Sequence, residues 1–183
     1  MLERGLDEIR RSPKETGRVE LIVRRPEVES REVLVEAELD PVEGLVGDCW
    51  RARGSKATED GSAHPEMQLT LMNARMAALV AGSRERWALA GDQLYVDMNL
   101  SYANLPPSTR VEVGSALIEI TAQPHTGCGK FIKRFGVDAQ KFVNTGVGRE
   151  LNLRGIYAKI VAAGTVRTGD PIRKRLGTTT AAG

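Results

Sequence analysis

Short segments in which apolar and polar residues alternate recur along most of the chain, and this pattern limits the possible folds more than any other feature. Residues 18–24 (RVELIVR) place Val19, Leu21 and Val23 on one side of an extended strand. Residues 31–39 (REVLVEAEL) repeat the pattern, with an expected buried face formed by Val33, Val35, Ala37 and Leu39. Because successive side chains point to opposite faces of a strand, both segments are expected to be half-buried strands.

Five further segments have the composition of strands. Their β-branched and aliphatic residues are bounded by Gly, Pro, Asn and Asp, which favour turns. These segments are 44–50, 67–72, 92–100, 110–121 and 154–166. Together, the seven segments predict a mainly β protein with a few short helices, folded as a barrel or a sandwich.

Two short helices are expected between the strands. Asn73 can cap a helix over residues 74–81, and Gly82 can end that helix. Asp138 can begin a second helix over residues 138–144, where Phe and Val form a short apolar stripe.

The chain is expected to form a single domain. Its 183 residues, numbered 1–183, are enough to bury a hydrophobic core, which is expected to extend over residues 18–174. The polar, turn-rich stretch 53–65 predicts an exposed loop within this domain. Both ends are expected to be flexible, including residues 177–183.

Composition argues against several classes of protein. No apolar run approaches the roughly 18 residues that a membrane-spanning helix needs, so a membrane partner is not expected. The N-terminal residues lack the apolar core of a signal peptide, which favours the cytoplasm. The net charge of +2 and the aromatic content of 4% argue against a nucleic-acid partner.

The segment PHTGCGKFIKRF, residues 124–135, holds one of the two cysteines and one of the two histidines. A cysteine attacks sulfur or binds metal as its thiolate, and nearby cations or a protonated histidine lower its pKa. His125 precedes Cys128 by three residues, and three cations follow: Lys130, Lys133 and Arg134. The segment therefore predicts a thiolate that attacks sulfur, binds a soft metal or carries a persulfide.

The same segment also favours an anionic ligand. Gly127 and Gly129 would let backbone amides approach an anion closely, and the cations would neutralise its charge. A phosphate-bearing small molecule with its reactive end near Cys128 fits this arrangement.

Each of these residues also has a structural explanation. Cys128 can serve as a small buried hydrophobe, His125 can bond the backbone in a turn, and the cations can form a solvated face. Cys49 is expected to pack within a strand as a free thiol. The spacing of the two cysteines and two histidines matches no compact zinc site.

The cysteine segment resembles the motif of the MOSC domain family, the module named for the C-terminal part of molybdenum cofactor sulfurase. Other segments follow in the order that the family shows: 44–48 (GLVGD), 90–100 (AGDQLYVDMNL), 112–121 (VEVGSALIEIT) and 153–170 (LRGIYAKIVAAGTVRTGD). The resemblance covers nearly the whole chain and is to stand-alone members of bacterial type. It implies a MOSC-type β-barrel, in agreement with the strand pattern.

The resemblance also implies functional roles. Cys128 matches the family's characteristic cysteine, which carries sulfur for metal-sulfur assembly or contacts the molybdenum of a bound molybdenum cofactor (molybdopterin). Asp48 and Arg154 lie in segments that match the family, and the resemblance implies that they help bind the cofactor. Residue chemistry alone assigns both of them to turns. The other expected cofactor-binding residues are Gly127, Gly129, Lys130, Lys133 and Arg134.

The chain departs from the family pattern at two places. Gly127 precedes the cysteine where many members have proline, and Cys49 and Trp50 follow the Gly-Asp motif where arginine and histidine are frequent. Pyridoxal phosphate binding belongs to the family through the sulfurase, and residues 1–183 suggest no lysine for the Schiff base.

The sequence leaves three functions open. The first is a sulfur carrier or cofactor-binding protein that acts through Cys128 and His125, with a sulfur donor or a molybdoenzyme as partner. The second is a molybdenum-dependent reductase of N-hydroxylated compounds, with Cys128 as a molybdenum ligand. The third is a non-catalytic barrel that serves as an interaction module. The sequence does not decide whether the protein is an enzyme, and it does not indicate the oligomeric state.

Overall fold

A computed structural model describes residues 2–127 and 129–175 of the chain. The expected fraying of residues 177–183 therefore lies outside the described part. The longer strands of the sheets are β1 (Thr16–Arg24), β3 (Glu36–Asp40), β5 (Leu69–Asn73), β8 (Ala116–Ile120) and β9 (Ile156–Ala162). The shorter strands are β2 (Glu32–Leu34), β4 (Gly44–Leu45), β6 (Leu94–Asp97), β7 (Arg110–Val113), β10 (Gly164–Arg167) and β11 (Pro171–Lys174).

Short helices connect these strands. The α-helices are α1 (Leu6–Arg10), α2 (Trp50–Arg53), α3 (Ala74–Ala81), α4 (Gly129–Val143) and α5 (Gly146–Glu150). Three 3-10 helices add to them: η1 (Glu3–Gly5), η2 (Pro65–Met67) and η3 (Arg84–Ala90). Every described helix is too short or too polar to cross a membrane.

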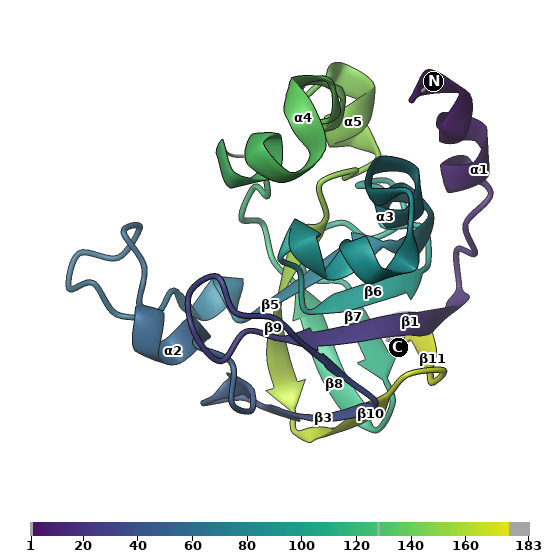
Figure 1. The fold of residues 1–183 in the computed structure, drawn as a ribbon. Helices are drawn as coiled ribbons and strands as arrows, with labels where there is room; N and C mark the ends of the chain where they lie inside the picture. The colour runs from purple at the N-terminus through teal and green to yellow at the C-terminus, as the bar shows by residue number, and fades with distance from the viewer. Residues whose placement is uncertain (1, 128, 176–183) are drawn as a thin grey trace.

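Pairing between the first and last strands closes the main sheet into a barrel (Figure 1). β1 pairs antiparallel with β11, which places Gly17 opposite Ile172. In the described part of the chain, the ring runs β1-β11-β7-β8-β9-β5-β6 and returns to β1. β2 lies on the outer edge of β1, and β10, β3 and β4 form a small second sheet. The predicted fold, a mainly β barrel with a few short helices, is confirmed.

A register shift in β1 divides its apolar side chains between two cores. The shift lies between Val19 and Leu21, where β1 pairs with β6. Val19 and Ile22 join the aliphatic cluster inside the barrel, whereas Leu21 and Val23 join a second cluster beneath the helices. The expectation that Val19, Leu21 and Val23 share one face is wrong, because an extra residue in a strand reverses the alternation.

The expected strand over residues 31–39 is two strands in different sheets. β2 pairs with the end of β1, and β3 pairs with β10 in the second sheet. Ala37 and Leu39 are buried as expected, but Val33 and Val35 are 63% and 79% exposed. The prediction fails at Val33 because β2 lies outside the ring of the barrel, and at Val35 because this residue lies in the bend between β2 and β3.

The strand expected over residues 44–50 ends at Leu45. Gly47 has a φ of +81°, a left-handed conformation that a side chain disfavours, and the chain turns there. α2 then begins at Trp50. Asp48 and Cys49 consequently lie in a turn between a strand and a helix, and the prediction that Cys49 packs within a strand is wrong.

The two predicted helices have different outcomes. α3 has the predicted bounds, with Asn73 Oδ1 accepting a hydrogen bond from Met76 N at 3.1 Å. α4 begins at Gly129 and consists of two helical segments that meet at Gly136, where φ is +89°. The second segment contains the predicted helix from Asp138. The first segment, which carries the three cations after Cys128, was not predicted.

Asn73→Ala should lower the free energy of unfolding by about 2 to 4 kcal/mol, because the amide caps α3 and makes further buried hydrogen bonds. Asn73 Nδ2 donates to Ser12 Oγ at 2.9 Å and to Met98 O at 2.8 Å. Thr145→Ala is the matched control, since Thr145 caps α5 from an exposed position. Urea denaturation should show a loss of about 1 kcal/mol for Thr145→Ala, and equal losses would contradict the prediction.

Candidate functional site

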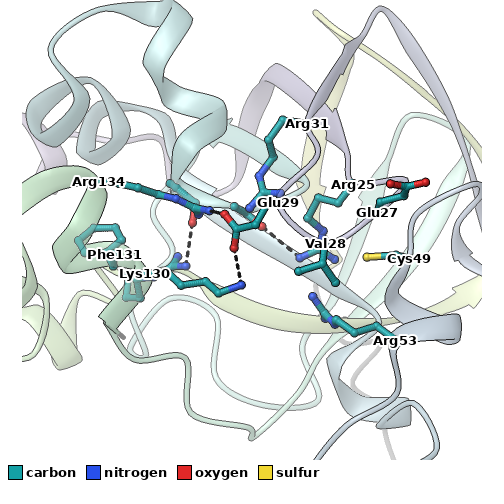
Figure 2. Close-up of a pocket in the computed structure, with 13 residues that line it drawn as sticks. Arg25, Glu27, Val28, Glu29, Arg31, Cys49, Arg53, Lys130, Phe131 and Arg134 are labelled. Carbon is teal, nitrogen blue, oxygen red and sulfur yellow. Dashed lines mark hydrogen bonds and ion pairs between the residues drawn. The ribbon is translucent and has the colours of Figure 1, made fainter.

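Cationic side chains from four parts of the chain line a cleft of about 150 Å³. Figure 2 shows the cleft between the loop after β1, α2 and the first segment of α4. We call it the arginine cleft. The cations that line it are Arg25, Arg31, Arg53, Lys130, Arg134 and Arg154. Among its described lining residues the only acids are Glu27 and Glu29, so the cleft is electropositive.

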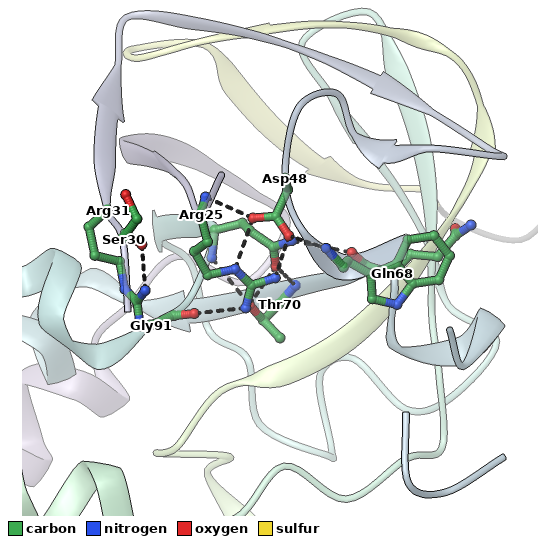
Figure 3. Close-up of polar contacts among 9 residues, drawn as sticks. Arg25, Ser30, Arg31, Asp48, Gln68, Thr70 and Gly91 are labelled. Carbon is green, nitrogen blue, oxygen red and sulfur yellow. Dashed lines mark hydrogen bonds and ion pairs between the residues drawn. The ribbon is translucent and has the colours of Figure 1, made fainter. Parts of the chain in front are cut away.

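A buried ion pair fixes one wall of the arginine cleft (Figure 3). Arg25 Nη2 and Nε donate to the two carboxylate oxygens of Asp48 at 2.8 and 2.9 Å, and Arg25 N donates to the same carboxylate at 2.9 Å. Asp48 also accepts a hydrogen bond from Trp50 N at 2.9 Å. Burial alone would lower the pKa of Arg25, but the hydrogen bonds and charge of Asp48 outweigh it and raise the pKa.

A second buried ion pair forms the floor. Arg154 Nη1 donates to Asp92 Oδ2 at 2.7 Å, and Arg154 Nη2 donates to Ala90 O at 3.0 Å. The Asp92 side chain is fully buried and that of Arg154 is 8% exposed. Burial raises the pKa of Asp92, and the charge and hydrogen bond of Arg154 oppose the rise. Removal of either partner would leave a buried charge without compensation.

His125 lies against this pair. Its Nδ1 is 3.7 Å from Asp92 Oδ1, and its side chain is 10% exposed. Burial lowers the pKa of His125 well below 6.5, and the charges of Arg154 and Arg25 lower it further. His125 is therefore neutral at pH 7. The close packing requires Gly155, whose φ is +104° and where a Cβ atom would lie 2.4 Å from Leu71 O.

Three guanidinium groups converge on Gly91. Arg25 Nη1 donates to Gly91 O at 3.1 Å. A Cβ atom at Gly91 would lie 3.3 Å from Arg31 Nη2 and 3.7 Å from Arg134 Nη1. Burial lowers the pKa of Arg31, and the neighbouring charges of Arg134 and Arg25 lower it further. Crowded like charges of this kind are relieved when an anion binds between them.

Glu29 closes the outer edge of the cleft. Its carboxylate bridges Lys130 Nζ, at 2.5 Å, and the guanidinium of Arg134 (Figure 2). These hydrogen bonds lower the pKa of Glu29 to about 2. Glu29 has a φ of 70°, an unusual conformation for a residue with a side chain. The loop after β1 thus supplies an internal anion to the two cations of α4.

Several buried N–H donors in the described part of the chain lack a protein acceptor. They are Arg31 Nε, Trp50 Nε1, Trp87 Nε1 and Arg154 Nε. Arg31 and Arg154 line the arginine cleft, and Trp50 lines a neighbouring cavity that also borders Arg25 and Arg53. Because an unpaired buried donor is costly, these groups favour a ligand with acceptor oxygens or nitrogens.

Two further cavities adjoin the arginine cleft. A cavity of about 160 Å³ shares Arg25, Arg53, Gly91 and Arg154 with it. A larger cavity of about 470 Å³ shares His125 and Arg154 with the second one. The chain just before Cys128 lines the larger cavity and the chain just after it lines the arginine cleft. Arg154 borders all three spaces.

The structure brings several of the predicted site residues together. Lys130, Arg134 and Arg154 line the arginine cleft, and His125 borders the adjoining cavities. Cys128, the principal candidate, lies outside the described residues, and so does any contact between it and His125.

Other predicted site residues lie elsewhere. Asp48 is behind the cleft, where Arg25 and backbone amides occupy its carboxylate. Lys133 is exposed and does not line the cleft. Gly127 N donates to Asn144 Oδ1 at 3.1 Å, so that amide is already paired. Gly129 is exposed at the start of α4.

The sequence did not identify five residues of the site: Arg25, Arg31, Arg53, Cys49 and Asp92. Cys49 is a free thiol, as predicted, but it lines the arginine cleft. Asp92 follows a glycine at the start of a strand, a place where residue chemistry suggests only a turn. Arg24 and Arg25 at the end of β1 are a sequence signal for this site, because consecutive cations where a strand meets a loop can form one wall of an anion site.

No protein-only metal site is present in the described residues, where no three His, Cys, Asp or Glu side chains cluster to hold an ion. The donors gathered at the cleft are N–H groups. These groups suit an anionic ligand, or the anionic end of a larger one, rather than a bare metal ion.

Comparisons with known proteins support the fold. No protein-family model matches the sequence, and no curated protein matches it. The solved structure of YuaD from Bacillus subtilis has a TM-score of 0.59 and 20% identity, over 86% of this chain and 94% of that one. YiiM from Escherichia coli has a TM-score of 0.56 and 20% identity, over 88% and 71% of the two chains. At these identities the likeness shows the fold alone.

Asp92→Asn should lower the free energy of unfolding by about 3 to 5 kcal/mol, because it leaves the buried Arg154 without its counter-charge. Asp97→Asn is the matched control. Asp97 pairs with Arg75 at 2.7 Å, and both side chains are about 30% exposed, so the loss should be about 1 kcal/mol or less. If urea denaturation shows the same loss of unfolding free energy for both variants, the buried pair of Asp92 and Arg154 contributes no more to stability than the exposed pair.

His125 should make stability depend on pH. Its pKa in the folded protein lies below the unfolded value near 6.5, so below pH 6.5 the unfolded chain binds a proton that the folded protein does not. Stability should therefore fall with decreasing pH, by up to about 1.4 kcal/mol per pH unit for this residue. In His125→Phe, the free energy of unfolding should change less steeply with pH, because the contribution of His125 is lost. An unchanged slope between pH 6.5 and 5 would contradict the assignment.

Proposed function

We propose that this protein is a MOSC-type module that binds a molybdenum cofactor or carries sulfur on Cys128. The observation that supports this proposal most strongly is the arginine cleft, where six cations line a space beside the segment that carries Cys128. The proposal agrees with the shared fold of the neighbouring structures and with the resemblance of the cysteine segment.

The cleft suits the anionic end of such a ligand. Arg31 and Arg154 each offer a buried Nε–H donor, and Arg53 adds an exposed guanidinium. Guanidinium groups bind phosphate oxygens through paired, charge-assisted hydrogen bonds. These three residues would hold the anion, with Lys130 and Arg134 joining them when Glu29 is displaced. The molybdenum cofactor, when bound, would supply a metal centre for the exchange of oxygen or sulfur.

Neutral His125 would act as a proton acceptor for the reacting group. Its pKa is low because its surroundings are buried and cationic, so at pH 7 the ring is neutral and one of its two nitrogens has a free lone pair that can accept a proton. Asp92, with Oδ1 at 3.7 Å, stands where it can stabilise the imidazolium that forms. A proton taken from the Cys128 thiol would leave the thiolate that sulfur transfer requires.

A second candidate function is the reduction of an organic substrate. The cavity of about 470 Å³ favours it, because that volume suits a small organic molecule. Its walls include the apolar side chains of Leu105, Ile120, Val143 and Ile156, with His125 and Arg154 also lining it. Such a reductase would need electrons from a partner protein, whereas the first proposal needs a sulfur donor or a molybdoenzyme that accepts the cofactor.

Native mass spectrometry with metal analysis distinguishes these functions from a non-catalytic role. The wild type and Cys128→Ala should be purified without reductant from cells that make molybdenum cofactor. We expect the wild type to carry a bound molybdopterin, or an added sulfur of about 32 Da that digestion locates on Cys128, and Cys128→Ala to lack that ligand or that site of addition. Lys133→Ala is a control that should keep the ligand, since Lys133 lies away from the cleft. Bare protein in every sample would contradict the proposal and favour an interaction module.

A further inference from the structure

Cys49 occupies a position that its sequence context did not indicate. It lies in the turn before α2, and Figure 2 shows its sulfur directed into the space bordered by Arg25, Val28 and Arg53. Its backbone is fixed by both arginines: Cys49 N donates to Arg25 O at 2.7 Å, and Cys49 O accepts from Arg53 N at 2.8 Å. The residue is 9% exposed, with its free thiol at the wall of the cleft.

The surroundings of this thiol indicate an anionic ligand. Within residues 2–127 and 129–175, Arg31 and Arg53 form no ion pair with an acid, although both line the cleft with Cys49. The side chain of Arg154 is 92% buried in the same cleft, and its Nε–H has no acceptor among the described residues. A small anion beside Cys49 would satisfy these groups together.

We propose that Cys49 is a second sulfur-accepting thiol, which takes the outer sulfur atom from a small anionic sulfane-sulfur donor of the thiosulfate class. This inference rests on the proposed function in sulfur carriage and extends it to a residue other than Cys128. The volume of the cleft, about 150 Å³, is below the roughly 300 Å³ of pockets for larger organic ligands, so a donor of a few atoms suits it.

The reaction balances without an added oxidant. The thiol of Cys49 loses its proton to water, and the thiolate attacks the outer sulfur of thiosulfate. A new bond forms between Sγ and that sulfur while the sulfur–sulfur bond of thiosulfate breaks. Sulfite leaves with the bonding electron pair, and Cys49 keeps the outer sulfur as a persulfide. Arg31, Arg53 and Arg154 would hold the sulfonate oxygens and stabilise the charge of the departing sulfite.

Intact-mass spectrometry of the full chain with thiosulfate tests this inference. The reduced protein is freed of reductant, incubated with thiosulfate and digested to locate the added sulfur. Cys128→Ala should gain a single sulfur of about 32 Da on Cys49, and the double variant Cys49→Ala/Cys128→Ala should gain none. Absence of sulfur on Cys49 in Cys128→Ala would overturn the inference.

The single variant Cys49→Ala separates this inference from the proposed function. Sulfur on Cys128 in that variant reports on the proposed function, whereas sulfur on Cys49 in Cys128→Ala reports on the inference. If Cys128 takes up sulfur and Cys49 does not, the inference about Cys49 is overturned and the proposed function of Cys128 is retained. Cys49→Ser is a further variant that keeps a small polar side chain if alanine perturbs the turn.

The arginine cleft should accelerate the reaction of Cys49 only with anions. In the Cys128→Ala background, Arg31→Gln should slow loading from thiosulfate about tenfold, because electrostatic attraction raises the local concentration of an anion. Arg31→Lys keeps the charge and should restore most of the rate. Alkylation by the neutral reagent iodoacetamide should proceed at the same rate in all three proteins. Equal slowing with both reagents would overturn the role of the cleft in binding the donor.

Discussion

The ion pair between Arg154 and Asp92 is the interaction on which the site depends. It joins the residues just before β9 to those just before β6, where the arginine cleft and the two adjoining cavities share Arg154. Such a pair gains little stability over a well-packed apolar core, because both charges lose their hydration. The pair instead fixes positions: Asp92 holds the guanidinium of Arg154 at the floor of the cleft, and Asp92 also lies against His125.

The remaining electrostatics follow from this arrangement. Burial beside Arg154 keeps His125 neutral, while Asp48 fixes Arg25 so that it faces Gly91 together with other guanidinium groups. The cations exceed the acids that accompany them, and Glu29 supplies only a partial internal counter-charge at the rim. Binding of an anion in such a cleft stabilises the folded protein, because it offsets the repulsion between the cations. A thiol in the cleft reacts preferentially with anionic partners.

The sequence predicted features that depend on local signals and missed those that depend on long-range pairing. The barrel and α3 follow from alternation and from the Asn73 cap, which neighbouring residues determine. The register shift in β1 and the exposed Val33 could not be foreseen, because they arise from pairing with β6 and from the limit of the barrel. Likewise, Arg25 and Gly91 are far apart in the chain and form a hydrogen bond only because β1 and β6 are neighbours.

If the arginine cleft binds anions, a small dianion should occupy it. Crystals of the wild type and of Arg31→Gln soaked in tungstate, a tetrahedral dianion with strong anomalous scattering, test this expectation most directly. We expect a tungsten peak within hydrogen-bonding reach of Arg31, Arg53 and Arg154 in the wild type, and a weaker peak in the variant. Tungsten found only at surface lysines, or an equally occupied cleft in Arg31→Gln, would show that these arginines do not form an anion site.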